Sequence, residues 1–174
     1  MITPPHVALA CLIGTGAEEI YKNNGSIDLG TIYASVIVIN LFFHYVLDVI
    51  PHGHTLNPFD TGNNLRSFYI ELAISASIIL LTLFISDQPI LIIVSSVASL
   101  IPDCVSTSLA KFKLPITLKK ILSQIQRFHF FIHWFEKIDE NGKRIVPNPS
   151  KFELISQSIF VILCIILIFL LKLK

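Results

Sequence analysis

Residues 152–171 read FELISQSIFVILCIILIFLL, and this run decides the class of fold. Its side chains are almost all apolar. About 20 such residues in a helix cross the ~30 Å of hydrocarbon in a lipid bilayer. The run therefore predicts a membrane-spanning helix over residues 152–172.

The composition of the whole chain agrees with that run. Of the 174 residues, 53% are hydrophobic and 14% are charged, and the mean hydropathy is +0.71. An average soluble domain has about 25% charged residues, so this chain has too few to cover a water-facing surface. A net charge of +1 without a basic stripe gives no indication of nucleic-acid binding. The three cysteines lie in apolar segments without CxxC spacing, which argues against disulfides and a thiolate zinc site.

Four more segments are apolar enough to predict membrane helices. The first has no basic region before it and is interpreted as a retained helix, not a signal peptide. The last contains Pro102, which removes a backbone hydrogen bond and predicts a kink. We therefore expect an all-α fold, an integral membrane helical bundle of about five spans in a single domain. The four segments are residues 4–20, 29–50, 67–86 and 89–110.

Residues 116–135 have a different pattern. Apolar side chains recur there every three or four residues, and the basic residues Lys119, Lys120 and Arg127 fall mostly on the opposite side. This pattern predicts an amphipathic helix along the membrane surface or beneath the bundle. Its basic face is expected to attract anionic lipid headgroups.

The basic residues also predict an orientation. With five spans, ten Lys and Arg residues fall on the side where the chain starts, and three (Lys22, Lys172 and Lys174) fall on the other side. The positive-inside rule assigns the more basic side to the cytoplasm. We therefore expect a multi-pass protein of the cell membrane with a cytoplasmic N-terminus. Glu18 and Glu19 are expected to be solvated or interfacial.

Two pairs of residues have the spacing of metal ligands. His44 and Asp48 in HYVLD are four residues apart, as are His129 and His133 in HFFIH. Residues at i and i+4 project from one face of a helix, so both side chains of a pair can reach one ion.

The predicted topology brings further candidates to the same depth. His6 opens the first helix and Asp103 comes late in the segment 89–110, so both are expected near the cytoplasmic side. Simpler roles are open for each residue, as an interfacial side chain, a helix cap or a neighbour's partner. The predicted metal ligands are His6, His44, Asp48, Asp103, His129 and His133, with Asp48 and Asp103 also catalytic. Asn40, His52 and His54 are expected to orient these ligands.

Four short motifs resemble those of a known family: TPPH at 3–6, HYVLDVIPHGH at 44–54, SLIPD at 99–103 and HFFIH at 129–133. They resemble motifs of the small bacterial membrane-bound metal-dependent hydrolases of the LexA-regulated type, with the order of the H-x-x-x-D and Pro-Asp elements exchanged. The resemblance implies that His6, His44, Asp48 and Asp103 occupy the family's motif positions. A more distant likeness is to helical trinuclear-zinc phosphodiesterases of the phospholipase C type.

These patterns favour a metal-dependent hydrolase that acts on a lipid or lipid-linked phosphoester at the cytoplasmic face. Mixed imidazole and carboxylate ligands suit zinc, and also manganese or iron. Membrane lipids are the expected partners, and association into homo- or hetero-oligomers stays open. Two alternatives also stay open: a non-enzymatic membrane subunit or assembly factor with a structural His/Asp cluster, and a metal or proton transporter.

Overall fold

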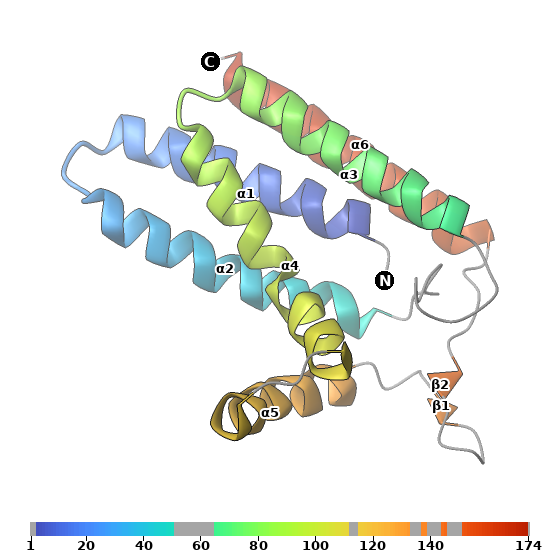
Figure 1. Cartoon of the computed structure of the whole chain (residues 1–174). Helices are drawn as coiled ribbons and strands as arrows, with labels where there is room; N and C mark the ends of the chain where they lie inside the picture. The colour runs from blue at the N-terminus through green and yellow to red at the C-terminus, as the bar shows by residue number, and fades with distance from the viewer. Residues whose placement is uncertain are drawn as a thin grey trace.

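The computed structural model describes residues 3–50, 65–111, 115–132, 137–138, 144–145 and 151–173. Over these residues the fold is all-α, as predicted (Figure 1), apart from one antiparallel pair of two-residue strands. Each predicted helix is present, with ends that differ from the prediction by at most three residues. The elements are α1 (Thr3–Asn23), α2 (Leu29–Val49), α3 (Leu65–Ile85), α4 (Pro89–Lys111), α5 (Ile116–Ile132), β1 (Lys137–Ile138), β2 (Arg144–Ile145) and α6 (Lys151–Lys172).

Helix α1 lies at the centre of the bundle and contacts α2, α3, α4 and α6 (Figure 1). Val7, Ala8 and Cys11 are fully buried in this helix. Because neighbouring helices surround α1, its sides need not be as apolar as those of the outer helices. Its 21 residues nevertheless have a helical length of about 30 Å, similar to the hydrocarbon thickness of a bilayer.

Gly14 permits a close approach of α1 to α4. A Cβ atom at Gly14 would lie 3.0 Å from Cδ1 of Ile92 and 3.2 Å from Cβ of Ser95. A larger side chain there would force the two helices apart. Small residues commonly occupy such positions where membrane helices meet.

A seam of buried hydrogen bonds joins α1, α2 and α4. Asn40 Nδ2 of α2 donates to Ser95 Oγ of α4 at 2.7 Å, and Ser95 Oγ donates to the Ala10 carbonyl of α1 at 2.6 Å. One turn further along α4, Ser99 Oγ donates to the His6 carbonyl at 3.2 Å. The seam therefore fixes α1, α2 and α4 beside one another at the end of the bundle that carries His6.

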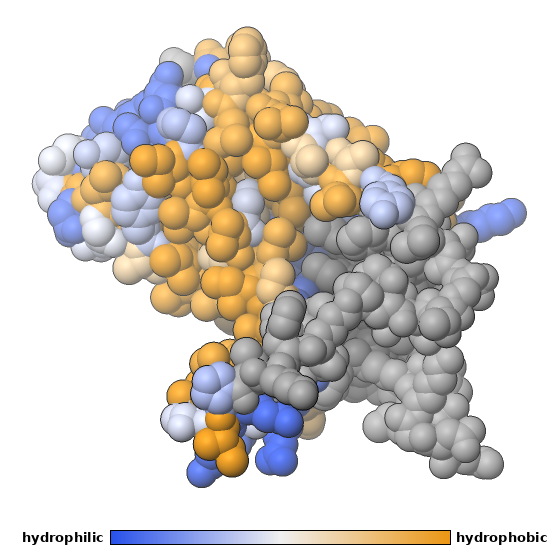
Figure 2. Space-filling view, in the orientation of Figure 1, coloured by the Kyte–Doolittle hydropathy of each residue, from blue (hydrophilic) through white to orange (hydrophobic). Residues whose placement is uncertain are grey.

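Much of the outer surface is apolar (Figure 2), with Val38, Leu80 and Phe84 between 65% and 89% exposed. Two described helices, α2 and α6, are long and apolar enough to cross a membrane. Shorter apolar stretches lie in α3 and α4, at Tyr69–Ile85 and Pro89–Val105. Length and composition thus support two of the predicted five spans and suggest membrane association.

The end of the bundle opposite His6 holds a cluster of ion pairs. Glu18 is fully buried and accepts hydrogen bonds from Ser86 Oγ at 2.8 Å and from the Asp87 backbone N–H at 2.9 Å. Its carboxylate lies 2.5 Å from Lys172 Nζ and 3.1 Å from Lys22 Nζ. Of the two predicted locations for Glu18, solvated or interfacial, the solvated one is wrong, because the α3–α4 turn and the end of α6 cover the carboxylate. A cavity of about 510 Å³ lies beside this cluster, at the far end from the histidines.

Candidate metal centre

His44 and Asp48 lie one turn apart on the buried face of α2, where His44 Nε2 is 3.0 Å from Asp48 Oδ2. Buried residues recur every fourth position along this helix, as Ile32, Val36, Asn40, His44 and Asp48. The helix begins at a capping residue, Asp28, whose Oδ1 accepts a hydrogen bond from the Thr31 backbone N–H at 2.9 Å. The buried stripe of α2 is thus apolar near its start and carries its ionisable groups near its end.

His6 of α1 completes a group of three. Its Nε2 lies 3.3 Å from Asp48 Oδ1, and its ring centroid is 4.5 Å from that of His44. The relative exposures of His6, His44 and Asp48 are 4%, 1% and 2%. Candidate ligand atoms of all three residues lie within 4.8 Å of one another.

These distances fit a bound metal ion. Two ligand atoms that each bind zinc at ~2.1 Å in tetrahedral geometry lie about 3.4 Å apart. His6 Nε2 lies 3.3 Å from Asp48 Oδ1 and His44 Nε2 lies 3.0 Å from Asp48 Oδ2, so both separations are close to that value and also match direct hydrogen bonds to the carboxylate. His6 Nδ1 is also buried and has no hydrogen-bond partner among the described residues. A buried histidine with an unpaired ring nitrogen is uncommon unless it has a further function.

Asp103 of α4 lies beside this group. Its charge interacts electrostatically with both His44 and Tyr45. The structure therefore brings four of the predicted residues, from three helices, to one end of the bundle. The three that share a possible ion site are His6, His44 and Asp48.

The remaining predicted site residues have other outcomes. Asn40 donates to Ser95 Oγ at 2.7 Å and to the Val36 carbonyl at 2.7 Å. These bonds hold α2 against α4. The predicted role of Asn40 in orienting a metal ligand stays a prediction. His129 lies on the backbone of α5, but its side chain is outside the described residues, as are His52, His54 and His133. The predicted roles of these four histidines stay predictions.

Comparisons with protein-family models, with curated proteins and with solved structures find no match for this chain. The candidate site therefore rests on its residues and their geometry.

Sequence reasoning missed Tyr45, which joins the site to α5. Its ring lies 5.5 Å from that of His44 and 5.0 Å from that of Phe128, in edge-to-face geometry with both. Such arrangements of rings are favourable. Position 45 follows a candidate ligand directly in sequence, but no spacing rule singles it out.

Two imidazoles and one carboxylate are a common ligand set for catalytic metals. Structural zinc sites in proteins are usually closed by four ligands, whereas catalytic sites have three and keep one position for water or substrate. A bound zinc ion would lower the pKa of that water to about 7 and so make hydroxide available near neutral pH. In such a site His6, His44 and Asp48 would hold the ion, and Asp103 would adjoin it.

Proposed function

We propose that this chain is a multi-pass membrane protein with a divalent metal centre, and that it hydrolyses a lipid or lipid-linked phosphoester at the cytoplasmic face. The observation that carries the proposal is the convergence of His6, His44 and Asp48 in a buried site. These are also the residues that, with Asp103, match the motifs of the membrane-bound metal-dependent hydrolases that the sequence resembles.

Length and composition support two spans, and the lengths and packing of the other long helices favour five. Helices α1, α2, α3, α4 and α6 each have 21 to 23 residues, enough for about 30 Å of hydrocarbon. Helix α1 is surrounded by the others, which accounts for its lower hydropathy. Exposed apolar side chains on α2, α3 and α6 are not covered by the described part of the chain and are suited to contact lipid.

The charge distribution supports a cytoplasmic location for the His/Asp site. With five spans, ten of the 13 basic residues are expected on the side that holds this site, and Lys22, Lys172 and Lys174 are expected on the opposite side. Lys22 and Lys172 form ion pairs with Glu18, so their positive charges are balanced within the protein.

Hydrolysis is favoured over a purely structural cluster by the number of ligands. The three ligands that the described residues provide leave a coordination position for the water that attacks the substrate. A structural site would instead be closed by four protein ligands.

A transporter is a second candidate because the seam of buried hydroxyl and amide groups continues from His6 into the middle of the bundle. The hydroxyls of Ser95 and Ser99 donate to backbone carbonyls, however, which is how polar residues hold membrane helices together. Because the hydroxyl protons are already bonded to backbone carbonyls, the seam is better suited to hold the helices together than to conduct ions or protons.

The hydrolase is tested with the purified full chain and phospholipids that carry a labelled headgroup. We expect zinc-dependent release of the headgroup, lost in His44→Ala and kept in Ser35→Ala, which alters an exposed position of the same helix. If the chain binds zinc but releases no more label than the His44→Ala variant, the hydrolase proposal is wrong and the metal centre has another role.

A further inference from the structure

Helix α5 has one broad apolar arc, of which only a part packs on the bundle. Leu122, Ile125 and Ile132 are partly or fully buried, and α5 contacts α4 and α2. Ile121, Phe128 and Phe131 are 57%, 53% and 80% exposed. At 100° per residue these three lie on an adjacent sector of the helix. Something other than the described protein must cover that sector, since exposed aromatic and aliphatic side chains are unfavourable in water.

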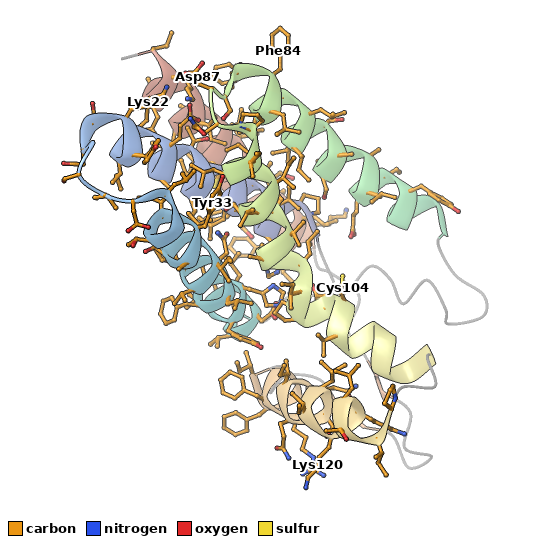
Figure 3. The ribbon with its side chains drawn as sticks, turned by 60° about the vertical axis from the view of Figure 1, so that its left-hand side comes forward. Lys22, Tyr33, Phe84, Asp87, Cys104 and Lys120 are labelled. Atoms are coloured by element: carbon orange, nitrogen blue, oxygen red, sulfur yellow. The ribbon has the colours of Figure 1, made fainter. Side chains whose placement is uncertain are left out.

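A basic sector lies next to the exposed apolar one. Lys119, Lys120 and Arg127 are all exposed, and Lys120 points away from the bundle (Figure 3). Within the described part of α5 no acidic residue balances these charges. An apolar sector flanked by cations is the pattern of a helix that lies in the interface of an anionic lipid leaflet.

The exposed side of α5 is also continuous with that of α2. Phe128 packs edge-to-face on Tyr45, with ring centroids 5.0 Å apart. Tyr45 lies between Phe42 and Val49 on one stripe of α2, and these two are 62% and 49% exposed. A single apolar surface therefore runs from α2 onto α5, next to His44 and at the end of the bundle that carries the candidate metal centre.

We propose that α5 lies in the membrane interface, with Ile121, Phe128 and Phe131 in the acyl region and Lys119, Lys120 and Arg127 on the phosphates of anionic headgroups. This inference rests on the membrane location in the proposed function, but not on metal binding or hydrolysis. The location of α5 narrows the substrate of the proposed hydrolase to amphiphiles with an anionic phosphate, because headgroups of that kind would be concentrated beside the site. A lipid leaflet fits better than a second copy of the chain, because the same basic row on a second copy would repel this one.

The acyl contact is tested by tryptophan fluorescence in vesicles. The full chain has one tryptophan, and Trp134→Phe removes it. In this background Phe131→Trp places a single tryptophan on the exposed apolar sector. Ser123→Trp, on the basic side of α5, is the control. We expect brominated acyl chains to quench Phe131→Trp strongly and aqueous acrylamide to quench it weakly, with the reverse for Ser123→Trp. Equal acrylamide quenching of the two variants, or shielding of Phe131→Trp from both quenchers, would overturn the proposal; shielding from both would indicate a protein partner.

The headgroup contact is tested with spin-labelled phosphatidylglycerol and phosphatidylcholine. Wild type should prefer the anionic lipid, and Lys119→Gln, Lys120→Gln and Arg127→Gln should each lower the preference by up to roughly fivefold. The three substitutions are also combined in one triple variant. Its matched control replaces Lys137, Lys143 and Arg144, three cations that follow α5 in sequence, by Gln. If this control lowers the preference as much as the α5 triple variant, the headgroup site is not on α5. Zinc content, measured on the same samples, reports separately on the metal centre.

Discussion

Asp48 Oδ1 of α2 lies 3.3 Å from His6 Nε2 of α1, although the two residues are far apart in sequence. The contact requires the first turns of α1 to lie beside the last turns of α2, and the hydrogen-bonded seam provides this arrangement. Ser99 and Ser95 of α4 bind the His6 and Ala10 carbonyls, and Asn40 of α2 binds Ser95. The site is therefore a consequence of how three helices pack.

The close approach of α1 and α4 gives a prediction for two glycines. Gly14→Ala should lower the free energy of unfolding by about 1–3 kcal/mol, because the new Cβ would meet Ile92 at 3.0 Å and Ser95 at 3.2 Å. Gly16→Ala is the matched control: it has no atom within 4 Å of the new Cβ and should gain up to about 1 kcal/mol from helix propensity. Thermal unfolding in detergent measures both. Equal effects of the two substitutions would show that the helices are not in close contact at Gly14.

The buried carboxylate at the far end gives a second prediction. Glu18→Gln should destabilise the protein by about 3 kcal/mol, because it leaves Lys172 mostly buried without the carboxylate that lies 2.5 Å from it. Glu19→Gln, which affects a carboxylate that is 24% exposed and shares the same lysines, should cost much less. The midpoints of thermal unfolding compare the two variants. If Glu19→Gln costs as much as Glu18→Gln, burial does not determine the effect.

The same cluster predicts a dependence on pH. The pKa of the exposed Asp87 carboxyl is lowered, chiefly by its hydrogen bond to Lys22, and the pKa of Lys22 is raised, chiefly by Asp87. A lowered pKa means that Asp87 adds stability above its unfolded pKa of about 3.9 and loses it as the pH falls through the folded pKa. Asp87→Asn should therefore be less stable than wild type at pH 7, and the difference should disappear in acid. A difference that persists after Asp87 is protonated would contradict the ion pair.

The helices could be predicted from sequence because each carries a clear pattern. Residues 159–171 are apolar throughout, and α5 repeats apolar residues every three or four positions. The His44–Asp48 pair follows from helical spacing alone. The inclusion of His6 followed from topology, since an alternating chain returns the end of α2 to the side where α1 begins.

Other features depend on neighbours that a sequence does not reveal. Glu18 has the same sequence context as Glu19, yet Glu18 is fully buried and Glu19 is 24% exposed, because the α3–α4 turn covers Glu18 while Lys172 pairs with both. In the same way, the hydropathy of α1 does not show that four helices surround it. The division of α5 into a packed and an exposed apolar side likewise needs the position of α4 and α2.

The central claim, that His6, His44 and Asp48 hold one metal ion, is tested most directly by metal analysis of the detergent-purified chain after exposure to zinc and removal of excess metal. Wild type and Ser35→Ala should retain about one ion per chain, and His6→Ala, His44→Ala and Asp48→Asn should each lose it while keeping their helical content. His133→Ala, measured alongside, shows whether the ligand set extends to the residues after α5. Full metal retention in His6→Ala, or no bound metal in wild type, would contradict the account.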